Sequence, residues 1–304
     1  MSSKSNAGTS CGFVSLIGAP NAGKSTLLNR LVGTKVSIVS RKVQTTRSCI
    51  RGIASEGKTQ IIFVDTPGIF APKRRLDRAM VTAAWEAAGT TDAVLVLIDV
   101  RKGIDAEAED IMARLPEISV TRLLALNKID TIARPKLLEI AAALNAKLAF
   151  AETYMISALR GDGLDKLKRD LAALMPPGPW LYPEDQVSDA PLRRLAAEIT
   201  REKLFDRLHD ELPYAAAVET AAWQDLADGS ARIEQIIYVE RPSHKKIVIG
   251  KGGQTIKAIG TAARKDIAEA AGQPVHLFLR VVVREHWTDD PERYRELGLA
   301  FPKG

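Results

Sequence analysis

The sequence predicts two domains, a doubly wound α/β domain followed by a smaller α+β domain. Its length of 304 residues fits two domains at roughly 150 residues each. Between residues 12 and 174, apolar runs alternate with longer amphipathic stretches, which is typical of parallel strands joined by helices. A proline-rich stretch then interrupts this alternation, and a different pattern follows it.

The composition is that of a globular protein, with 46% hydrophobic and 26% charged residues. The two cysteines, Cys11 and Cys49, exclude a disulfide framework and a four-ligand zinc site, and they suit a reducing compartment. The longest apolar run, at residues 93–98, is far shorter than the ~20 residues of a membrane span. Residues 1–11 lack the pattern of a signal or transit peptide and are predicted to be a disordered tail. We therefore expect a cytoplasmic protein.

The first domain is predicted to cover residues 12–175. All but the last of its apolar runs are nearly continuous, as expected of strands buried on both faces of a parallel sheet. The runs lie at residues 13–17, 60–64, 93–99, 122–126 and 149–156. Segments between them, such as 76–88 and 104–115, have the spacing of amphipathic helices. In such a domain, phosphate chemistry is expected at the carboxyl ends of the strands.

The second domain is predicted to cover residues 191–304, including a C-terminal tail. Residues 175–183 contain four prolines and one glycine, so no regular element continues through them, and a linker is predicted at 176–190. The order after the linker is α, β, β, α, α, β. The elements are a helix at 192–212, strands at 214–223 and 231–240, a helical stretch interrupted at 250–253, and a strand at 274–284.

Residues 18–25, Gly-Ala-Pro-Asn-Ala-Gly-Lys-Ser, form a GxxxxGKS phosphate loop. The strand at 13–17 precedes it and a helix at 26–32 follows it, which is the context that this motif requires. The glycines let successive N–H groups face a phosphate at the positive end of the helix. Lys24 is predicted to reach the β- and γ-phosphates, and the Ser25 hydroxyl is predicted to ligate Mg²⁺. The predicted nucleotide-binding residues are Gly18, Asn21, Ala22, Gly23, Lys24, Ser25 and Thr26.

Residues 127–130, Asn-Lys-Ile-Asp, follow the strand at 122–126 and indicate which base is bound. The Asp130 carboxylate can accept hydrogen bonds from guanine N1–H and the exocyclic amine, and adenine does not offer both donors. Backbone after the last strand, at Ser157 and Ala158, is predicted to donate to guanine O6, although these residues would also fit a plain helix start. The predicted base-binding residues are Asn127, Lys128, Asp130, Ser157 and Ala158. An ATPase or metabolic kinase is the rival, and Asp130→Ala would separate the two.

Two further segments are predicted to sense the γ-phosphate. Residues 65–68, Asp-Thr-Pro-Gly, end a strand, so that Asp65 can hold Mg²⁺ through water and the Gly68 N–H can contact the γ-phosphate. A threonine within residues 44–47 can ligate Mg²⁺ and order its loop in the triphosphate state. Thr46 is favoured over Thr45, and both stay open from the sequence alone. The predicted metal ligands are Ser25, Thr46 and Asp65.

Together these spacings resemble the translation-factor-like class of small GTPases. One residue departs from the Ras-like pattern, because Ile69 follows Gly68 where a glutamine usually positions the attacking water. Slow intrinsic hydrolysis is therefore expected. Some bacterial GTPases with the pattern GxPNxGKS place K⁺ beside the phosphates through the asparagine, which is Asn21 here. The predicted catalytic residues are Asn21, Lys24, Thr46 and Gly68.

The second motif lies at residues 247–256, Ile-Val-Ile-Gly-Lys-Gly-Gly-Gln-Thr-Ile. Its GxxG loop at 250–253 lets a nucleic-acid backbone approach closely, and Lys251 adds positive charge. Residues 241–265 hold seven Lys and Arg residues and no acidic residue, which favours a polyanionic partner. With the predicted element order, the motif resembles a type II KH domain, and an ordinary helix–turn–helix is the alternative. The predicted RNA-binding residues are Lys245, Lys246, Ile249, Gly250, Lys251, Gly252, Gly253 and Lys257.

A GTPase domain, a proline-rich linker and one C-terminal KH domain together resemble the Era family of ribosome-assembly GTPases. The stretches at 182–185, 197–203, 211–214 and 256–260 also match that family's sequences. The resemblance implies binding to the 3′ end of small-subunit ribosomal RNA, with the nucleotide state controlling whether RNA is held. The expected cofactors are GTP or GDP and Mg²⁺, with K⁺ as a further candidate, and the expected partners of the monomer are ribosomal RNA and the small ribosomal subunit.

Two alternatives stay open from the sequence. The protein could be an RNA-binding protein whose regulatory nucleotide site hardly hydrolyses GTP, which Ile69 allows. Basic residues near the GxxG loop could also meet anionic lipid in a peripheral membrane association, although no helix pairs that charge with a large apolar face.

Overall fold

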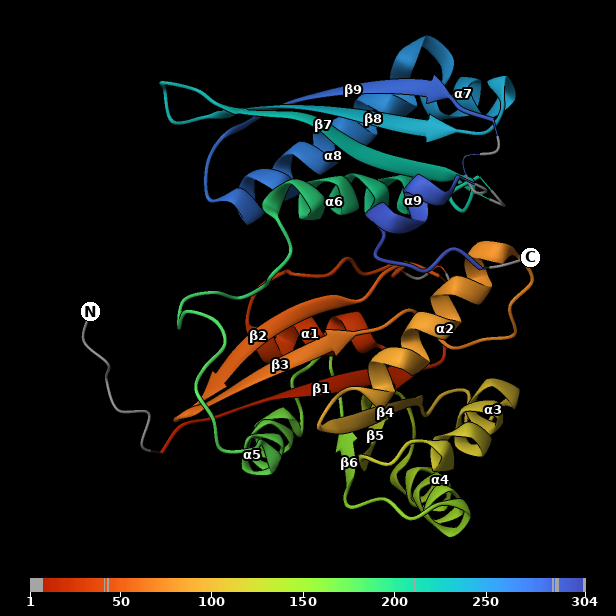
Figure 1. Ribbon diagram of the computed structural model, residues 1–304. Helices are drawn as coiled ribbons and strands as arrows, with labels where there is room; N and C mark the ends of the chain where they lie inside the picture. Colours follow the sequence, from red (N-terminus) through yellow and green to blue (C-terminus); the bar gives the residue numbers. More distant parts are fainter. Residues whose placement is uncertain are drawn as a thin grey trace. The chain divides into compact units, whose positions relative to one another are not determined.

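The structure is a computed structural model that describes residues 8–40, 42, 44–209, 212–285, 287 and 290–302. These residues form two compact units (Figure 1). The first unit takes the described residues within 1–37, 46–189 and 298–304, and the second takes those within 38–45 and 190–297. Residues 38–45 are therefore an insertion in the sequence of the first unit that belongs to the second.

The first unit contains a six-stranded sheet in the order β2-β3-β1-β4-β5-β6. Neighbouring strands are parallel except β2 and β3, which are antiparallel. Every residue of β4 is buried, as expected of a strand that is covered on both faces. The strands are β1 (Ser10–Gly18), β2 (Ile50–Glu56), β3 (Thr59–Asp65), β4 (Ala93–Asp99), β5 (Thr121–Asn127) and β6 (Thr153–Ile156).

Helices cover both faces of this sheet (Figure 1). Strand residues such as Leu95 join one apolar cluster with α1 and α5, and the alternate residues, such as Val96, join a second cluster with α2, α3 and α4. The predicted doubly wound α/β architecture is therefore confirmed. The helices are α1 (Lys24–Val32), α2 (Arg75–Gly89), α3 (Ala106–Arg114), α4 (Arg134–Lys147) and α5 (Leu164–Leu174), with short 3₁₀ turns at Leu115–Glu117 and Ile129–Thr131.

Several strand boundaries differ from those expected from apolar runs. β2 lies at the edge of the sheet and is only partly buried, so its sequence has no continuous apolar run that would reveal it. β6 is shorter than the run at 149–156 because residues 149–152 lie before the strand. β1 begins inside the predicted tail, because Ser10 and Cys11 pair with Thr59 and Gln60 of β3.

Residues 176–189 lie within the predicted linker and contain no helix or strand, but they belong to the first unit and hydrogen-bond to other parts of it. Ile53 N donates to the carbonyl of Val187 at 2.9 Å, and Trp180 Nε1 donates to the carbonyl of Lys58 at 3.0 Å. The stretch is thus an ordered strap along β2 and the β2–β3 turn, and the longer part of the second unit begins at Ala190.

The second unit has the predicted order of a helix, two strands, two helices and a strand. Its sheet has the order β7-β8-β9, with β7 and β8 antiparallel and β8 and β9 parallel. Apolar residues of α6 and α8 pack against one face of this sheet. The first helix ends at Arg207 rather than near residue 212, and a short C-terminal helix is added. The elements are α6 (Leu192–Arg207), β7 (Ala216–Asp225), β8 (Ala231–Val239), α7 (Pro242–Ile249), a 3₁₀ turn (Lys251–Gly253), α8 (Gln254–Ala271), β9 (Val275–Val283) and α9 (Pro291–Glu296).

Candidate functional site

The phosphate loop turns sharply between the end of β1 and the start of α1. Asn21 and Gly23 have positive φ values of 63° and 103°, which curls the backbone in front of the helix N-terminus. A side chain at Gly23 would place its Cβ 2.2 Å from Asn127 Nδ2, and one at Gly18 would place it 2.5 Å from the Leu97 carbonyl oxygen. Glycine is therefore required at both positions, and the N–H groups of the loop and helix are arranged for an anion.

The ammonium group of Lys24 lies buried over this loop. Its Nζ donates to the carbonyl oxygens of Gly18 at 2.9 Å and Ala19 at 3.0 Å. Burial lowers the pKa of Lys24 to about 8, and the negative charge of Asp65 only partly opposes this effect. A phosphate group would supply the anionic partner that this buried cation needs.

The three predicted metal ligands lie together at the carboxyl end of β3. Ser25 Oγ donates to Asp65 Oδ2 at 2.6 Å and lies 3.0 Å from Thr46 Oγ1. Ser37 Oγ also donates to Asp65 Oδ2, at 2.9 Å. Ser37 joins this cluster although no sequence motif marked it, and only its contact with Asp65 reveals it.

The carboxylate of Asp65 is fully buried, and burial raises its pKa. Its Oδ1 atom has no hydrogen-bond partner among the described residues. A buried carboxylate oxygen without a partner is costly, and two hydroxyl groups lie beside the same side chain. This set of hard oxygen donors fits Mg²⁺, which favours one or two carboxylates, hydroxyls, water and phosphate oxygens.

The two candidate threonines point to different partners. Thr46 Oγ1 contacts Ser25, as above, whereas Thr45 Oγ1 donates to the carbonyl of Lys42 at 2.8 Å. The geometry thus favours Thr46 at the metal site.

The base-binding motif is fastened to the phosphate loop by Asn127. Its Nδ2 donates to the Ala22 carbonyl at 2.8 Å, and its Oδ1 accepts from the backbone N–H of Ala158 at 2.9 Å. Lys128 Nζ donates to the Asn21 carbonyl at 2.5 Å and pairs with Asp99 at 2.6 Å. Asn127 and Lys128 therefore connect the base-binding motif to the phosphate loop, to Ala158 and to Asp99 at the end of β4. Asp99 was not predicted, since an acidic residue at the end of a strand carries no motif by itself.

Asp130 is held ready to accept hydrogen bonds from a base. Ser157 Oγ donates to Asp130 Oδ1 at 2.6 Å, and this hydrogen bond lowers the pKa of Asp130. Arg160 Nε lies 3.7 Å from Oδ2. The carboxylate is therefore ionised at neutral pH and can accept two donors, which guanine offers and adenine does not.

The phosphate-sensing segment at residues 65–68 is held against the phosphate loop at its C-terminal end. Ile69 N donates to the Gly18 carbonyl at 3.1 Å, and a Cβ at Gly68 would come within 3.0 Å of the Pro20 backbone. The Ile69 side chain is buried in the second apolar cluster. It offers no polar atom to a water molecule, in keeping with slow intrinsic hydrolysis.

The GxxG loop joins α7 to α8 in the second unit. Gly250 has a φ of 76°, and a Cβ there would lie 2.2 Å from Thr255 Oγ1, so this position requires glycine. Lys251 and Gly252 are exposed at the tip of the loop. Lys246 and Lys257 are exposed on the flanking helices, while Lys245, Ile249 and Gly253 are partly buried. The predicted RNA-binding residues thus surround one loop.

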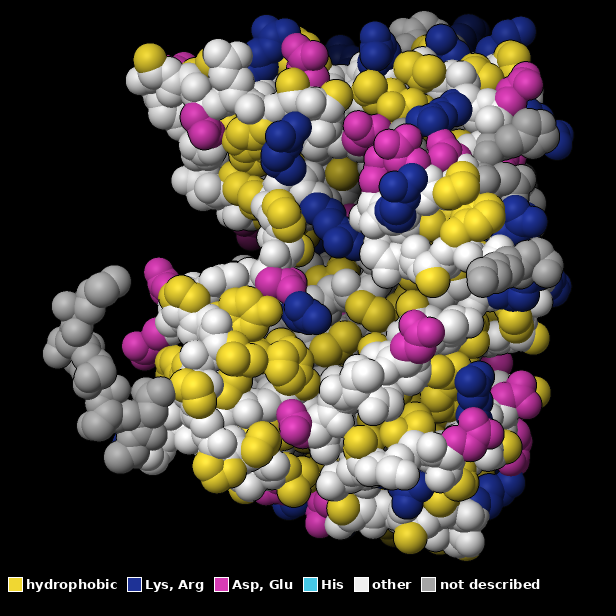
Figure 2. All heavy atoms as spheres, viewed as in Figure 1, with side chains coloured by type: hydrophobic (Ala, Val, Ile, Leu, Met, Phe, Trp, Pro, Cys, Tyr) yellow, Lys and Arg dark blue, Asp and Glu magenta, His cyan; other side chains and the backbone are white. Residues whose placement is uncertain are grey.

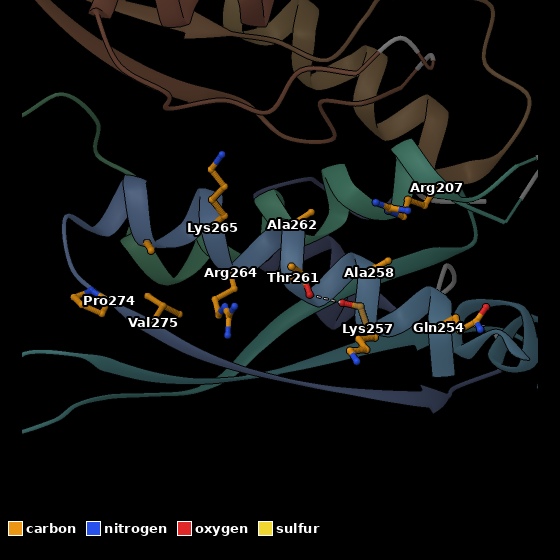
Figure 3. Close-up of a pocket in the computed structure, with 11 residues that line it drawn as sticks. Arg207, Gln254, Lys257, Ala258, Thr261, Ala262, Arg264, Lys265, Pro274 and Val275 are labelled. Atoms are coloured by element: carbon orange, nitrogen blue, oxygen red, sulfur yellow. Dashed lines mark hydrogen bonds between the residues drawn. The ribbon is translucent and has the colours of Figure 1, made fainter. Parts of the chain in front are cut away.

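A pocket of about 930 Å³ runs along α8 from the end of this loop (Figure 3). Lys257 and Arg264 project on one side of the helix, and Lys265 projects on the other. Arg207 of α6 also lines the pocket, and the sequence did not single it out. Figure 2 shows further Lys and Arg side chains along the top of the second unit, over α7 and β9. This distribution of basic side chains suits a polyanion.

Comparisons with known proteins identify a GTPase domain and a KH domain. Residues 13–128 match the family of 50S ribosome-binding GTPases, and residues 211–288 match the KH domain family. GTPase Era of Afipia carboxidovorans is 65% identical over 295 residues, which cover 97% of this chain and 96% of that protein. GTPase Era of Bradyrhizobium sp. strain ORS 278 is 64% identical over the same length. This chain belongs to the Era family of GTPases.

Two solved Era structures have the same fold. A variant of Aquifex aeolicus Era bound to GDP·AlF4⁻ is 38% identical, with a TM-score of 0.91 over 96% of this chain and 100% of that one. Era in complex with MgGDPNP and nucleotides 1506–1542 of 16S ribosomal RNA gives the same identity and TM-score, over 96% of this chain and 99% of that one. The recognition as an Era GTPase, the two-domain fold and the GTPase activity predicted from the sequence are therefore confirmed. In the described part of the chain, no helix is long and apolar enough to cross a membrane.

Proposed function

We propose that this GTPase binds the 3′ end of small-subunit ribosomal RNA through its KH domain and assists small-subunit assembly, with the bound nucleotide setting its affinity for RNA. The observation that carries the proposal is the presence, in one chain, of a guanine-nucleotide site and a basic GxxG loop. The Era relative crystallised with MgGDPNP and nucleotides 1506–1542 of 16S ribosomal RNA supports it.

The chemistry of the second unit supports single-stranded RNA as the ligand. The glycines of the GxxG loop leave its backbone open to phosphates, and Lys251 and Lys257 are exposed beside it. Ile247 has 55% of its side chain exposed, so it offers an apolar surface for an unstacked base next to the charged loop. Double-stranded RNA hides its bases, and it would leave this apolar surface unused.

Residues of the first unit would hold Mg²⁺ together with the nucleotide. Ser25 and Thr46 offer hydroxyl oxygens, and Asp65 offers a carboxylate, directly or through water. The cation would neutralise charge on the β- and γ-phosphates. Gly68 N–H and Lys24 would donate to the γ-phosphate, so loss of that phosphate releases the segments that carry Thr46 and Gly68.

We further propose that K⁺ binds next to the phosphates at Asn21, because Ile69 cannot position water and another source of positive charge is needed. Hydrolysis should then be faster in KCl than in NaCl, and Asn21→Asp should abolish the difference. Equal rates in the two salts would contradict this part of the proposal. The expectations of a monomer, a cytoplasmic location and peripheral membrane association stay predictions.

The proposed function is tested by RNA binding in the two nucleotide states. A fluorescent oligonucleotide with the 3′-terminal sequence of small-subunit ribosomal RNA should bind the full chain with different affinity in GDPNP and in GDP. Lys251→Glu should weaken binding at least tenfold, whereas Lys136→Glu, on the exposed face of α4 in the first unit, should not. Equal binding of a scrambled oligonucleotide, or no effect of Lys251→Glu, would rule out the assignment.

A further inference from the structure

The 38–45 segment, residues 38 to 45, connects two groups at the predicted metal site. Ser37 precedes it and donates to Asp65, and Thr46 follows it and contacts Ser25. Both ends therefore lie beside the predicted nucleotide, while the segment itself belongs to the second unit. The segment is therefore joined by the backbone to Ser37 at one end and to Thr46 at the other.

Apolar packing attaches the segment to the second unit at Ile38. This side chain is fully buried in a cluster with Ile199 of α6 and Ile267 of α8. α6 precedes residues 211–288, which match the KH domain family. The 38–45 segment therefore packs against α6, which lies outside the part of the second unit that matches the KH family.

Charged side chains of α6 hold the backbone of the segment. Glu202 Oε1 accepts a hydrogen bond from the Val39 N–H at 2.8 Å. Arg201 Nη2 donates to the carbonyl of Thr45, next to Thr46 in the chain. Lys42 of the segment donates in turn to the Leu208 carbonyl just after α6. The segment is therefore held near its start, in its middle and at its end.

Both charges are buried, and each also pairs with a neighbour on α6, Arg201 with Glu198 and Glu202 with Lys203. Arg201 is 2% exposed and Glu202 is 4% exposed, and buried charges are often less stabilising than apolar residues of the same size. Among the described residues, Arg201 Nη1 has no hydrogen-bond partner. Both side chains bind backbone atoms of the 38–45 segment. They therefore constrain the backbone conformation of the segment, whatever side chains it carries.

We infer that Glu202 and Arg201 are positioning residues that keep the 38–45 segment in the path that presents Thr46 and Ser37 to the metal site. The inference rests on the proposed function, because it names the residues through which nucleotide and RNA affinities are linked. When the γ-phosphate is lost and Thr46 is released, the hydrogen bonds of α6 to the segment change as well. By reciprocity, RNA that alters the second unit alters the hold on the nucleotide by the same factor.

Val39 offers a test that leaves α6 untouched. Val39→Pro removes the N–H that Glu202 accepts, whereas Val39→Ala keeps it and serves as the matched control. The measurement is the ratio of oligonucleotide affinities in GDPNP and GDP, using the full chain and the 3′-terminal ribosomal oligonucleotide. In the unchanged protein the ratio should differ from one by about fivefold or more. It should fall to within about twofold of one in Val39→Pro and be retained in Val39→Ala.

A second pair of variants addresses the helix. In Glu202→Ala the ratio of the two affinities should also fall to within about twofold of one. Glu202→Gln should keep much of the difference, because the amide oxygen can still accept a hydrogen bond from the Val39 N–H. Arg193→Ala controls for general damage to α6, since Arg193 hydrogen-bonds the carbonyls of Thr220 and Ala221 rather than the segment. If Glu202→Ala fails to fold, the two Val39 variants decide alone.

The possible outcomes are distinct. A ratio that survives in both Val39→Pro and Glu202→Ala overturns the inference and leaves the proposed function intact. A ratio of one in the unchanged protein overturns the proposed function and the inference with it. A ratio lost equally in Arg193→Ala and Val39→Ala also overturns the inference, because it would show a general sensitivity of this unit.

Discussion

Raising the pH from 7 to 8.5 should weaken GDP binding, because the buried ammonium group of Lys24 loses its proton in this range. Burial lowers the pKa of Lys24 to about 8, and only the protonated form can pair with phosphate. Bound phosphate stabilises that form and raises the pKa, so binding above pH 8 must take up a proton.

The magnitude follows from the protonated fraction. With a pKa of about 8, roughly nine tenths of Lys24 is protonated at pH 7 and about a quarter at pH 8.5. The affinity should therefore fall about fourfold, or about 0.8 kcal/mol. Proton uptake on binding should rise from about 0.1 to about 0.8 per nucleotide over the same range.

Isothermal titration calorimetry in buffers with different ionisation enthalpies measures both quantities. Below pH 8.5, guanine N1 keeps its proton and Asp130 stays ionised, so neither contributes. Lys24→Arg is the control, because a guanidinium stays protonated; its weaker binding should not change over this pH range. A constant affinity and no proton uptake in the unchanged protein would refute the reasoning.

Three other expectations follow from the same sites. Asp130→Ala should weaken GDP binding about 100-fold or more, at about 1.5–3 kcal/mol for each of two hydrogen bonds to a charged group, and leave ADP binding unchanged in competition assays; an equal loss for both would count against base recognition. Gly250→Ala should cost about 1–3 kcal/mol in thermal unfolding because of its positive φ and its contact with Thr255. Gly252→Ala, with no atom within 4 Å of the new Cβ, should cost less, and equal costs would contradict this. If about four phosphates are contacted, RNA affinity should fall about 50-fold between 50 and 200 mM salt, whereas a flat dependence would exclude electrostatic binding.

Motifs that are contiguous in the sequence could be located without the structure. The phosphate loop, the Asn-Lys-Ile-Asp sequence and the GxxG loop each place their groups within ten residues, so spacing alone identifies them. The same holds for the central strands, whose burial on both faces leaves continuous apolar runs.

Features that depend on tertiary contacts could not be found in this way. Ser37 and Asp99 gain their roles only because Asp65 and Lys128 lie beside them in space. β2 is an antiparallel edge strand without an apolar run. The proline content of residues 176–189 predicted a linker. The strap is held by hydrogen bonds to backbone atoms, and composition does not reveal such bonds.

The link from Asn127 to Ala22 and Ala158 has a consequence for the speed and selectivity of nucleotide capture. Because these hydrogen bonds join parts of the chain itself, the frame around the base and the phosphates forms when the domain folds. A nucleotide can then bind to a preformed site. A base other than guanine is rejected because it leaves hydrogen-bonding groups of the site unpaired. Discrimination should consequently appear mainly in the rate of departure, with guanine and adenine nucleotides arriving at similar rates.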